Sequence, residues 1–238
     1  MTSMAGAAAG GAADMRVRAA AIFQTLIDCF GTPTFRPGSD PTEELIGTIL
    51  SANTTDVNSG RAFARLQQLG DWDAIRTAPL PAIIDAIRPA GMYNQKGPHI
   101  VATLEQLRSK RGGYDLSDLA TMAVDEALAF LTSMPGVGQK TASIVLLFCF
   151  NRGVFPVDTH IQRITQRLGL CAPSASPSAV QRVWEGLLPP ETFYPLHINL
   201  IRLGREICTA RVARCPMCPL EDWCDYAQVN RGRGMRTT

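Results

Sequence analysis

Four cysteines lie close together near the C-terminus, and thiolates at such spacing bind metals: Cys208, Cys215, Cys218 and Cys224. The pattern Cys-x6-Cys-x2-Cys-x5-Cys places them within 17 residues, which suits either a [4Fe–4S] cluster or a zinc ion. The spacing alone does not separate the two. The N-terminus lacks the basic and apolar regions of a secretion signal. We therefore expect a cytoplasmic protein whose clustered cysteines bind metal instead of forming disulfides.

A glycine-containing turn offers a second chemical feature. Residues 134–142 (MPGVGQKTA) join two apolar segments. Gly136 and Gly138 permit a tight turn and let a phosphate approach the backbone around Val137 and Gln139. The helix expected to follow presents free N–H groups and the positive end of its dipole. This arrangement suits a grip on a nucleic-acid backbone that is independent of sequence, although two glycines alone are more typical of a plain helix–helix turn.

Lys140 and Asp158 could act in one mechanism. Lys140 is the second residue of the expected helix, where the positive dipole end disfavours an ammonium, and a lysine that loses its proton can form a Schiff base. Asp158 precedes an amphipathic segment, residues 161–168, and is expected to cap it. Taken singly, Lys140 could merely contact phosphate, and Asp158 could be only a cap.

The elements that must position these residues are predicted to be helical. Apolar residues recur at helical spacing, strand-like alternation is nearly absent, and the connections carry Gly, Pro, Asn or Asp. We predict an all-α chain of ten or more short helices, with helical segments at 19–30, 45–50, 57–69, 81–87, 97–107, 125–131, 139–150 and 161–168. The Ala/Gly-rich residues 1–14 are predicted to be a disordered tail, and the basic residues 231–236 to be flexible.

Composition and charge limit the classes of protein. A chain of 238 residues, 46% hydrophobic and 18% charged, fits one or two globular domains and excludes collagen, coiled coil and wholesale disorder. It has no apolar run of the roughly 18–20 residues that a membrane helix needs. Residues 140–214 carry nine Lys or Arg against four Asp or Glu, whereas the first 110 residues are balanced. This bias indicates either a basic face for nucleic acid or an ordinary solvated surface.

The two central motifs together resemble a known family. PGVGQKTA (135–142) followed by PVDTH (156–160) resembles the endonuclease III family of DNA glycosylases, in the helix-hairpin-helix glycosylase superfamily. The resemblance runs from about residue 19 to residue 224. It implies that Lys140 attacks C1′ of a damaged nucleotide and that Asp158 assists.

The cysteine spacing also coincides with the cluster loop of that family. The resemblance therefore implies that the four cysteines hold a [4Fe–4S] cluster with a structural, DNA-orienting role. Two arginines inside the loop, Arg211 and Arg214, are expected to contact phosphates. Solvated loop arginines and a zinc-bearing helical scaffold are the alternatives.

Three further positions match the family with some departures. LSANTTD (50–56) resembles the family's LSAQATD, whose glutamine enters the gap left by a flipped base; Asn53 is one methylene shorter, which bears on lesion preference. GMYNQK (91–96) resembles GLYNxK, whose leucine wedges into the duplex, so Met92 would be the wedge or else a core residue. His160 would face the DNA gap or else simply lie on its helix.

The resemblance implies two helical lobes. A six-helix domain would hold residues 42–152, and residues 15–41 with 153–238 would form an iron–sulfur cluster domain, with a DNA cleft between them. A flipped base would enter where Lys140 faces Asp158. Residues 112–127 form a longer segment than the family leads us to expect.

The function implied is that of a bifunctional DNA N-glycosylase and AP lyase of base excision repair. It would remove oxidised pyrimidines such as thymine glycol through a lysine Schiff base and cut the strand by β-elimination. Its partner would be double-stranded DNA with damaged bases or abasic sites. The protein is expected to be a monomer and not to bind membranes. The alternatives are an AP lyase or a glycosylase with another lesion preference, and a non-catalytic DNA-binding iron–sulfur protein.

Overall fold

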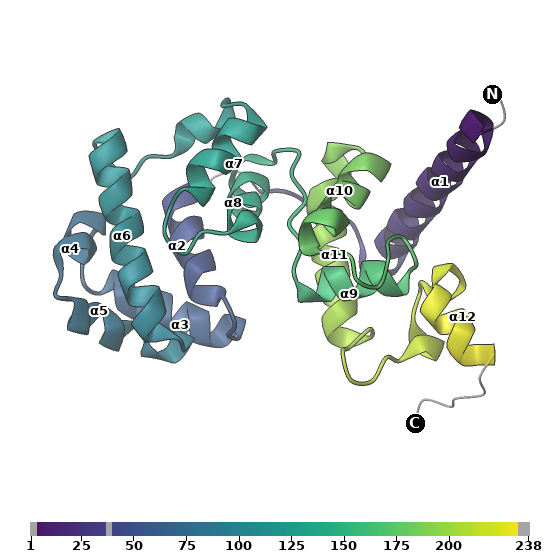
Figure 1. The fold of residues 1–238 in the computed structure, drawn as a ribbon. Coiled ribbons are helices and arrows are strands. Elements are labelled where there is room, and N and C mark those ends of the chain that lie inside the picture. Colours follow the sequence, from purple (N-terminus) through teal and green to yellow (C-terminus); the bar gives the residue numbers. More distant parts are fainter. Residues whose placement is uncertain (1–3, 37–39, 233–238) are drawn as a thin grey trace. The chain divides into compact units, whose positions relative to one another are not determined.

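The computed structural model describes residues 4–36 and 40–232. These residues form twelve α-helices and five short 3₁₀ helices, and their one strand-like pairing is an isolated antiparallel bridge between Cys208 and Ala213. The predicted all-α class is confirmed for this part of the chain. Two compact units are present (Figure 1): a central unit, Arg36–Arg152, and a terminal unit, Met1–Phe35 with Gly153–Thr238.

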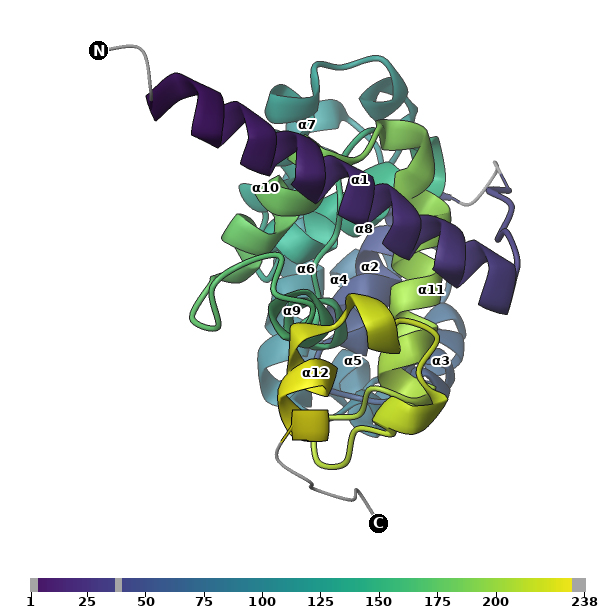
Figure 2. The same ribbon diagram turned by 90° about the vertical axis from the view of Figure 1, so that its right-hand side faces the viewer.

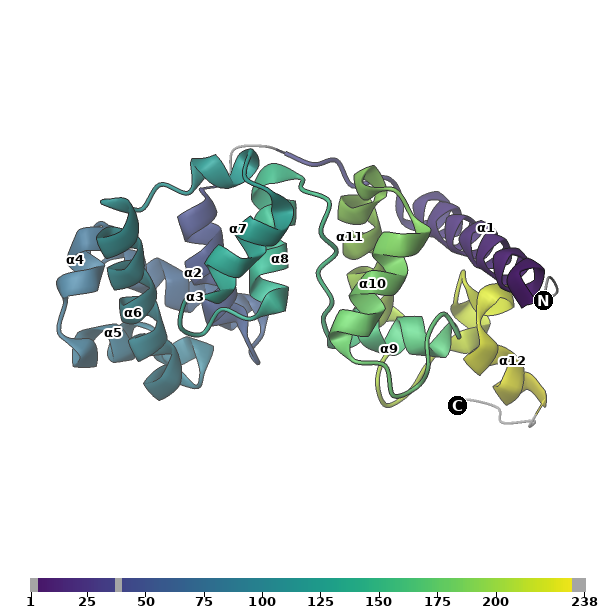
Figure 3. The same ribbon diagram turned by 45° about the horizontal axis from the view of Figure 1, so that its top comes forward.

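The central unit contains seven α-helices in its described residues. Helix α2 packs against α3 and α8, α6 packs against α4 and α5, and α7 lies beside α8 (Figure 3). The short 3₁₀ helices η1 (Arg88–Ala90) and η2 (Ser117–Ala120) lie in the connections before α6 and α7. The bounds of the α-helices are α2 Pro41–Ser51, α3 Asp56–Gln67, α4 Trp72–Thr77, α5 Leu80–Ala86, α6 Tyr93–Arg111, α7 Val124–Thr132 and α8 Gln139–Phe150.

Helix α4 is the helix of this unit that the apolar pattern does not predict. It has six residues, and of these only Ile75 is buried. The helix is therefore too short for apolar residues to recur at a spacing of three or four. Its start is set by a cap instead: the Asp71 carboxylate accepts a hydrogen bond of 2.8 Å from the Ala74 N–H. The described part of this unit thus contains helices at the six positions that the sequence pattern predicts, and the short α4 in addition.

The long segment at residues 112–127 is bound to the rest of the central unit. The Tyr114 hydroxyl donates to Asp73 at 2.6 Å, and the Tyr114 carbonyl accepts from the Thr42 hydroxyl at 2.5 Å. Further along, the Arg152 guanidinium donates to three main-chain carbonyls, those of Leu119, Ala120 and Met122. The extra length thus forms an anchored layer that ends at α7.

The terminal unit packs four helices around a core that includes Trp184. Helix α11 contacts α9 and α1, and α1 also crosses α10 (Figure 2). Trp184 is fully buried, and its indole N–H donates to the Thr165 hydroxyl at 2.8 Å, so its polar group is satisfied. The bounds are α1 Met4–Phe30, α9 Thr159–Arg167, α10 Pro177–Leu187, α11 Phe193–Glu206 and α12 Asp225–Gly232, with the 3₁₀ helices η3 Pro190–Thr192, η4 Cys215–Met217 and η5 Glu221–Trp223.

Helix α1 begins earlier than the sequence pattern predicts. It includes residues 4–14, for which composition predicts disorder. Alanine is the strongest helix former, and it outnumbers glycine in this stretch; the apolar stripe that begins at residue 19 continues the same helix. Residues 1–3 of the predicted tail and residues 233–236 of the basic segment lie outside the described residues.

No helix in the described part of the chain is both long and apolar enough to cross a membrane.

Candidate functional site

The turn between α7 and α8 forms a helical hairpin in the central unit (Figure 3). Gly136 has φ +77°, a left-handed conformation that favours glycine. The Val137 N–H donates to the Met134 carbonyl at 3.2 Å, and the Val137 side chain is only 6% exposed. Gly138 and Gln139, in contrast, are exposed. The main chain of the hairpin is therefore accessible from residue 138 onward, whereas the Val137 side chain is buried beneath the turn.

Helix α6 packs against this hairpin through Thr103 and His99. The Thr103 hydroxyl donates to the Pro135 carbonyl at 3.1 Å. A Cβ at Gly136 would meet the His99 side chain, with Nδ1 at 2.6 Å and Cγ at 2.8 Å. The bare backbone of Gly136 thus lies directly on His99. No local sequence signal identifies these two residues, because their partners lie more than 30 positions away.

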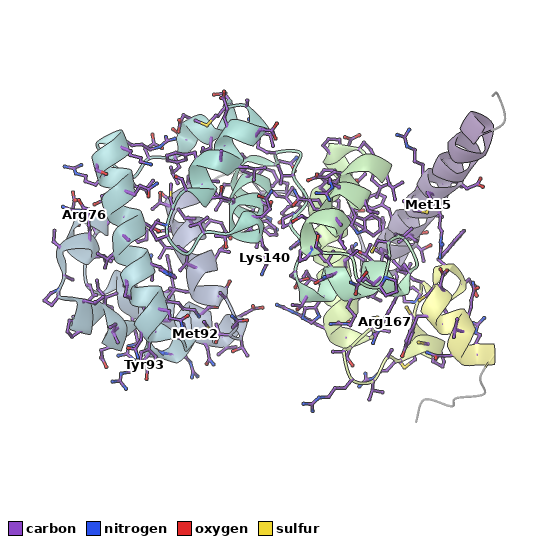
Figure 4. All side chains as sticks on the ribbon, in the orientation of Figure 1. Met15, Arg76, Met92, Tyr93, Lys140 and Arg167 are labelled. Atoms are coloured by element: carbon purple, nitrogen blue, oxygen red, sulfur yellow. The ribbon has the colours of Figure 1, made fainter. Side chains whose placement is uncertain are left out.

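Lys140 lies in the first turn of α8 and is exposed (Figure 4). Gly138 is the N-cap, and in the described chain no side chain hydrogen-bonds to this helix start. The first N–H groups of an α-helix have no partner within the helix. The N-terminus of α8 therefore offers main-chain donors, a positive dipole end and a primary amine at one place.

Asp158 begins α9 in the terminal unit. Its Oδ1 accepts a hydrogen bond of 2.8 Å from the Ile161 N–H, so the predicted N-cap is confirmed. The residue is half-buried. The cap uses one carboxylate oxygen and fixes the orientation of the group at the helix start.

His160 is held in a defined orientation in the terminal unit. The Arg163 guanidinium lies 3.1 Å from His160 Nδ1. Because arginine only donates, Nδ1 accepts, and the proton of a neutral ring sits on Nε2. The imidazole also packs on Gly204, where a Cβ would lie 2.7 Å from His160 Cβ. His160 lies two residues after Asp158, and the DNA contact expected for it stays a prediction.

The four cysteines lie in the loop after α11, and two arginines of α9 bind this loop. Arg163 donates to the Cys208 carbonyl at 2.7 Å. Arg167, labelled in Figure 4, donates to Cys208 Sγ at 3.1 Å and to the Thr209 carbonyl at 2.9 Å. Its guanidinium lies over the Tyr226 ring. In the sequence both arginines are simply part of the amphipathic segment 161–168, but in the structure they attach the cysteine loop to α9.

The cysteine thiols are close enough to influence each other electrostatically. Burial raises the pKa of Cys218 to about 12 and also raises the pKa values of Cys215 and Cys224, and neighbouring thiolates add to each increase. Among the described residues, however, no three Cys, His, Asp or Glu side chains stand together as ligands of one metal ion. In the same loop, the side chains of Arg211 and Arg214 are exposed.

Asn53 and Met92 are neighbours in the central unit. Each has a left-handed backbone, with φ values of +54° and +49°, which is uncommon for residues other than glycine. The Asn53 amide donates to the Met92 sulfur at 3.5 Å. Met92 is 46% exposed, so the alternative of a core residue is excluded. The two residues form one exposed tip.

A separate hollow of about 530 Å³ lies over α2 and α3. Its lining includes Asp40, Glu43, Glu44 and Asp56. A concave surface lined with carboxylates repels a phosphate backbone, so this hollow is no part of the candidate site.

Comparisons with known proteins agree with these motifs. The model of the HhH-GPD superfamily of base excision DNA repair proteins matches residues 46–190. Endonuclease III of Sulfolobus acidocaldarius is 36% identical over 185 residues, covering 76% of this chain and 80% of that protein. Endonuclease III of Escherichia coli is 34% identical over 191 residues, covering 80% and 86%.

The chain belongs to the endonuclease III family of base excision repair DNA glycosylases.

Solved structures of the endonuclease III family have the same fold. A non-covalent endonuclease III–DNA complex matches with a TM-score of 0.79 at 28% identity, covering 92% of this chain and 98% of that one. A trapped endonuclease III–DNA covalent intermediate matches with a TM-score of 0.76 at 28% identity, covering 88% and 95%. The superfamily match includes the hairpin, Lys140 and Asp158, but it ends before the cysteine loop.

The hairpin yields a first prediction. Gly136→Ala should lower the free energy of unfolding by about 1–3 kcal/mol, because its Cβ would collide with His99 in a left-handed conformation. Gly138→Ala is the matched control: its φ is −92°, and a Cβ there would meet no atom within 4 Å, so about 1 kcal/mol or less is expected. Chemical denaturation measures both, and equal losses would contradict this account of the turn.

Proposed function

We propose that this member of the endonuclease III family is a bifunctional DNA N-glycosylase and AP lyase that removes oxidised pyrimidines, such as thymine glycol, from double-stranded DNA. The observation that carries the proposal is Lys140. An exposed primary amine follows directly on a glycine hairpin, at a helix start that no side chain caps in the described chain. The same helix end can therefore bind a phosphate and supply a nucleophile.

Lys140 would form the covalent intermediate. Its neutral amine attacks C1′ of the damaged nucleotide, the N-glycosidic bond breaks, and the base leaves with its bonding electrons and takes up a proton. Loss of the amine proton and opening of the sugar ring give a Schiff base between Lys140 Nζ and C1′. Removal of a C2′ proton then expels the 3′ phosphate by β-elimination, which cuts the strand. Water finally releases the lysine.

Asp158 would stabilise positive charge in the transition state and would not act as a nucleophile. Positive charge develops on the sugar as the glycosidic bond breaks, and a fixed carboxylate stabilises it. Because the Ile161 N–H already orients the carboxylate, little reorganisation is needed. Asp158 belongs to the terminal unit and Lys140 to the central unit, so each role is assigned and tested separately.

Contacts with the DNA backbone would come from two regions. In the hairpin, Gly138 and Gln139 present main-chain N–H groups at the start of α8, which bind phosphate without reading sequence. In the cysteine loop, Arg211 and Arg214 are exposed cations. Two solved structures of endonuclease III that share this fold are complexes with DNA, which supports duplex DNA as the partner.

The four cysteines would hold a [4Fe–4S] cluster. The support is their spacing, Cys-x6-Cys-x2-Cys-x5-Cys, which coincides with that of the cluster loop in the endonuclease III family to which the chain belongs. Their thiols also lie within electrostatic range of each other. When bound, the cluster would supply a rigid cross-link of the loop, and the base-removal chemistry needs no redox step.

Asn53 bears on the lesion preference. Its exposed amide lies at the tip formed with Met92, where the family pattern has a longer side chain. If Asn53 fails to fill the gap left by a flipped base, cutting at abasic sites would exceed base removal. A lyase that prefers another lesion is therefore the second candidate function.

Lys140→Gln tests the nucleophile. Borohydride should trap the unchanged protein on duplexes carrying thymine glycol or an abasic site, and the variant should form no adduct on either, because an amide cannot form a Schiff base. Duplex affinity should change by less than about threefold, since one phosphate contact is worth little at moderate salt. Lys110→Gln, an exposed lysine on α6, is the control.

Each outcome is informative. Equal loss of trapping and binding would reduce Lys140 to a phosphate contact. Trapping on the abasic duplex alone would support the lyase with another lesion preference. If the unchanged protein gave no adduct on either duplex, the proposed mechanism would be wrong, and a non-catalytic DNA-binding module would remain.

Asp158→Asn separates the charge from the cap. Asparagine caps helices as well as aspartate does, so the thermal midpoint should stay nearly constant. Single-turnover excision of thymine glycol should nevertheless fall by about 10²–10³-fold, as expected for loss of a preorganised charge. A fall in excision matched by a fall in folded protein would argue that Asp158 is a cap only.

Cys218→Ser tests the cluster. The purified protein should be brown with broad visible absorption, and iron and acid-labile sulfide should be present in equal amounts. Cys218→Ser should lose most of this colour, whereas Cys29→Ser, at an exposed position on α1, should keep it. A colourless protein containing zinc would overturn the assignment.

A further inference from the structure

Lys96 is a buried charged residue with an unusual set of partners. It lies in the first turn of α6 and is 4% exposed. Its ammonium donates to three main-chain carbonyls, those of Leu50 at 2.8 Å, Ala52 at 2.7 Å and Ala90 at 2.8 Å. An ammonium has three donors and no acceptor. Every N–H of the group therefore has an acceptor although no carboxylate is among them.

These carbonyls belong to two different turns. Leu50 and Ala52 lie at the C-terminal end of α2, directly before Asn53, and Ala90 ends η1, two residues before Met92. The Lys96 main-chain N–H also donates to the Met92 carbonyl at 2.9 Å. One residue thus binds the turn at 51–54 through its side chain, and the turn at 90–93 through both its side chain and its main chain.

Burying the charged Lys96 ammonium is unfavourable by itself. Burial lowers the pKa of Lys96 below its usual range, as expected for an ammonium removed from water. The last carbonyls of a helix lack partners within the helix, and exposed ends obtain them from water. At Lys96 the two ends are instead brought to a single nitrogen, so the side chain determines their separation.

The two turns that meet at Lys96 also meet at their tips. Asn53 and Met92 are both exposed, both left-handed, and joined by the amide–sulfur contact of 3.5 Å. Left-handed residues persist only where surrounding contacts hold them. Figure 4 shows Met92 beside Tyr93 at the start of α6, one helical turn from Lys96. The ammonium is therefore the internal support of an exposed pair.

We propose that Lys96 is a positioning residue for lesion recognition, which couples the turns at 51–54 and 90–93 so that Asn53 and Met92 enter damaged duplex DNA as one element. The proposal rests on the proposed function for the DNA contact itself. It assigns Lys96 no contact with DNA and no part in Schiff-base chemistry.

The first test uses the free protein and compares three variants. Lys96→Met keeps the length and apolar stem but removes all donors; Lys96→Gln restores two of them; Lys110→Met is the same change at an exposed position of α6. The readout is amide hydrogen exchange at Thr54, Gly91 and Gln95, whose N–H groups hydrogen-bond within the two turns, with Val137 of the hairpin as the internal reference.

Lys96→Met should accelerate exchange in both turns together by about tenfold and leave Val137 nearly unchanged. Lys96→Gln should lie between it and the unchanged protein, and Lys110→Met should have no effect. Acceleration in one turn only, or an equal acceleration at Val137, would overturn the coupling, since the first shows independent turns and the second a general loss of stability.

The second test measures recognition. With 2-aminopurine beside an abasic site, binding of the unchanged protein should raise fluorescence as the tip unstacks the base. Lys96→Met should lower this rise and slow thymine glycol excision by about tenfold, as small misplacements do, while borohydride trapping at an abasic site falls less. Lys110→Met should match the unchanged protein. Parallel falls in excision and trapping would contradict a role in recognition.

The decisive comparison uses the tip itself. If Lys96 acts through Asn53 and Met92, Lys96→Met should add less than about twofold to the excision defect of Asn53→Ala/Met92→Ala. Independent, multiplicative effects would overturn the proposal. If the unchanged protein neither excised thymine glycol nor was trapped, the proposed function would fail, whereas the exchange experiment would still decide whether Lys96 couples the turns.

Discussion

Main-chain carbonyls at helix ends and in loops need donors, and in this protein cationic side chains supply several of them, some directly beside candidate functional residues. Lys96 binds three such carbonyls beneath the exposed tip, Arg152 binds three in the segment before α7, and Arg163 and Arg167 bind those of the cysteine loop. A fold of many short helices has many ends and correspondingly many unpaired groups. Hydrogen bonds from a charged donor are stronger than neutral ones, so these contacts fix the loops without adding further secondary structure.

This use of cations changes the meaning of the charge pattern. The excess of Lys and Arg in residues 140–214 predicts a basic face or an ordinary solvated surface, but Arg152, Arg163 and Arg167 are directed to carbonyls within their own units. Arg202 pairs with Glu206 and stacks on Phe30. Net charge counts a residue equally whether it faces solvent or binds main chain, so the sequence overstates the positive surface available to DNA.

Sequence patterns predict what is local. The helical class, the hairpin and the cap at Asp158 follow from residue types within a few positions of each other, and all three are present. What the patterns miss depends on distant contacts. The support of Gly136 by His99, and the convergence of carbonyls on Lys96, join residues tens of positions apart whose types have many other uses. Helix α4 is missed for a different reason, since six residues are too few for a periodic pattern.

The arrangement at Lys96 can also be viewed as coordination chemistry. Three carbonyl oxygens at 2.7–2.8 Å around one nitrogen resemble the way backbone oxygens replace the water around a monovalent cation. Here the cation is part of the chain, so it cannot dissociate or exchange with the medium, and the site stays filled at any ionic strength. Arginine could not substitute, because its planar guanidinium spreads its donors over several atoms. Two turns far apart in sequence are thereby joined around a cation that is covalently part of the chain and reaches its site when the protein folds.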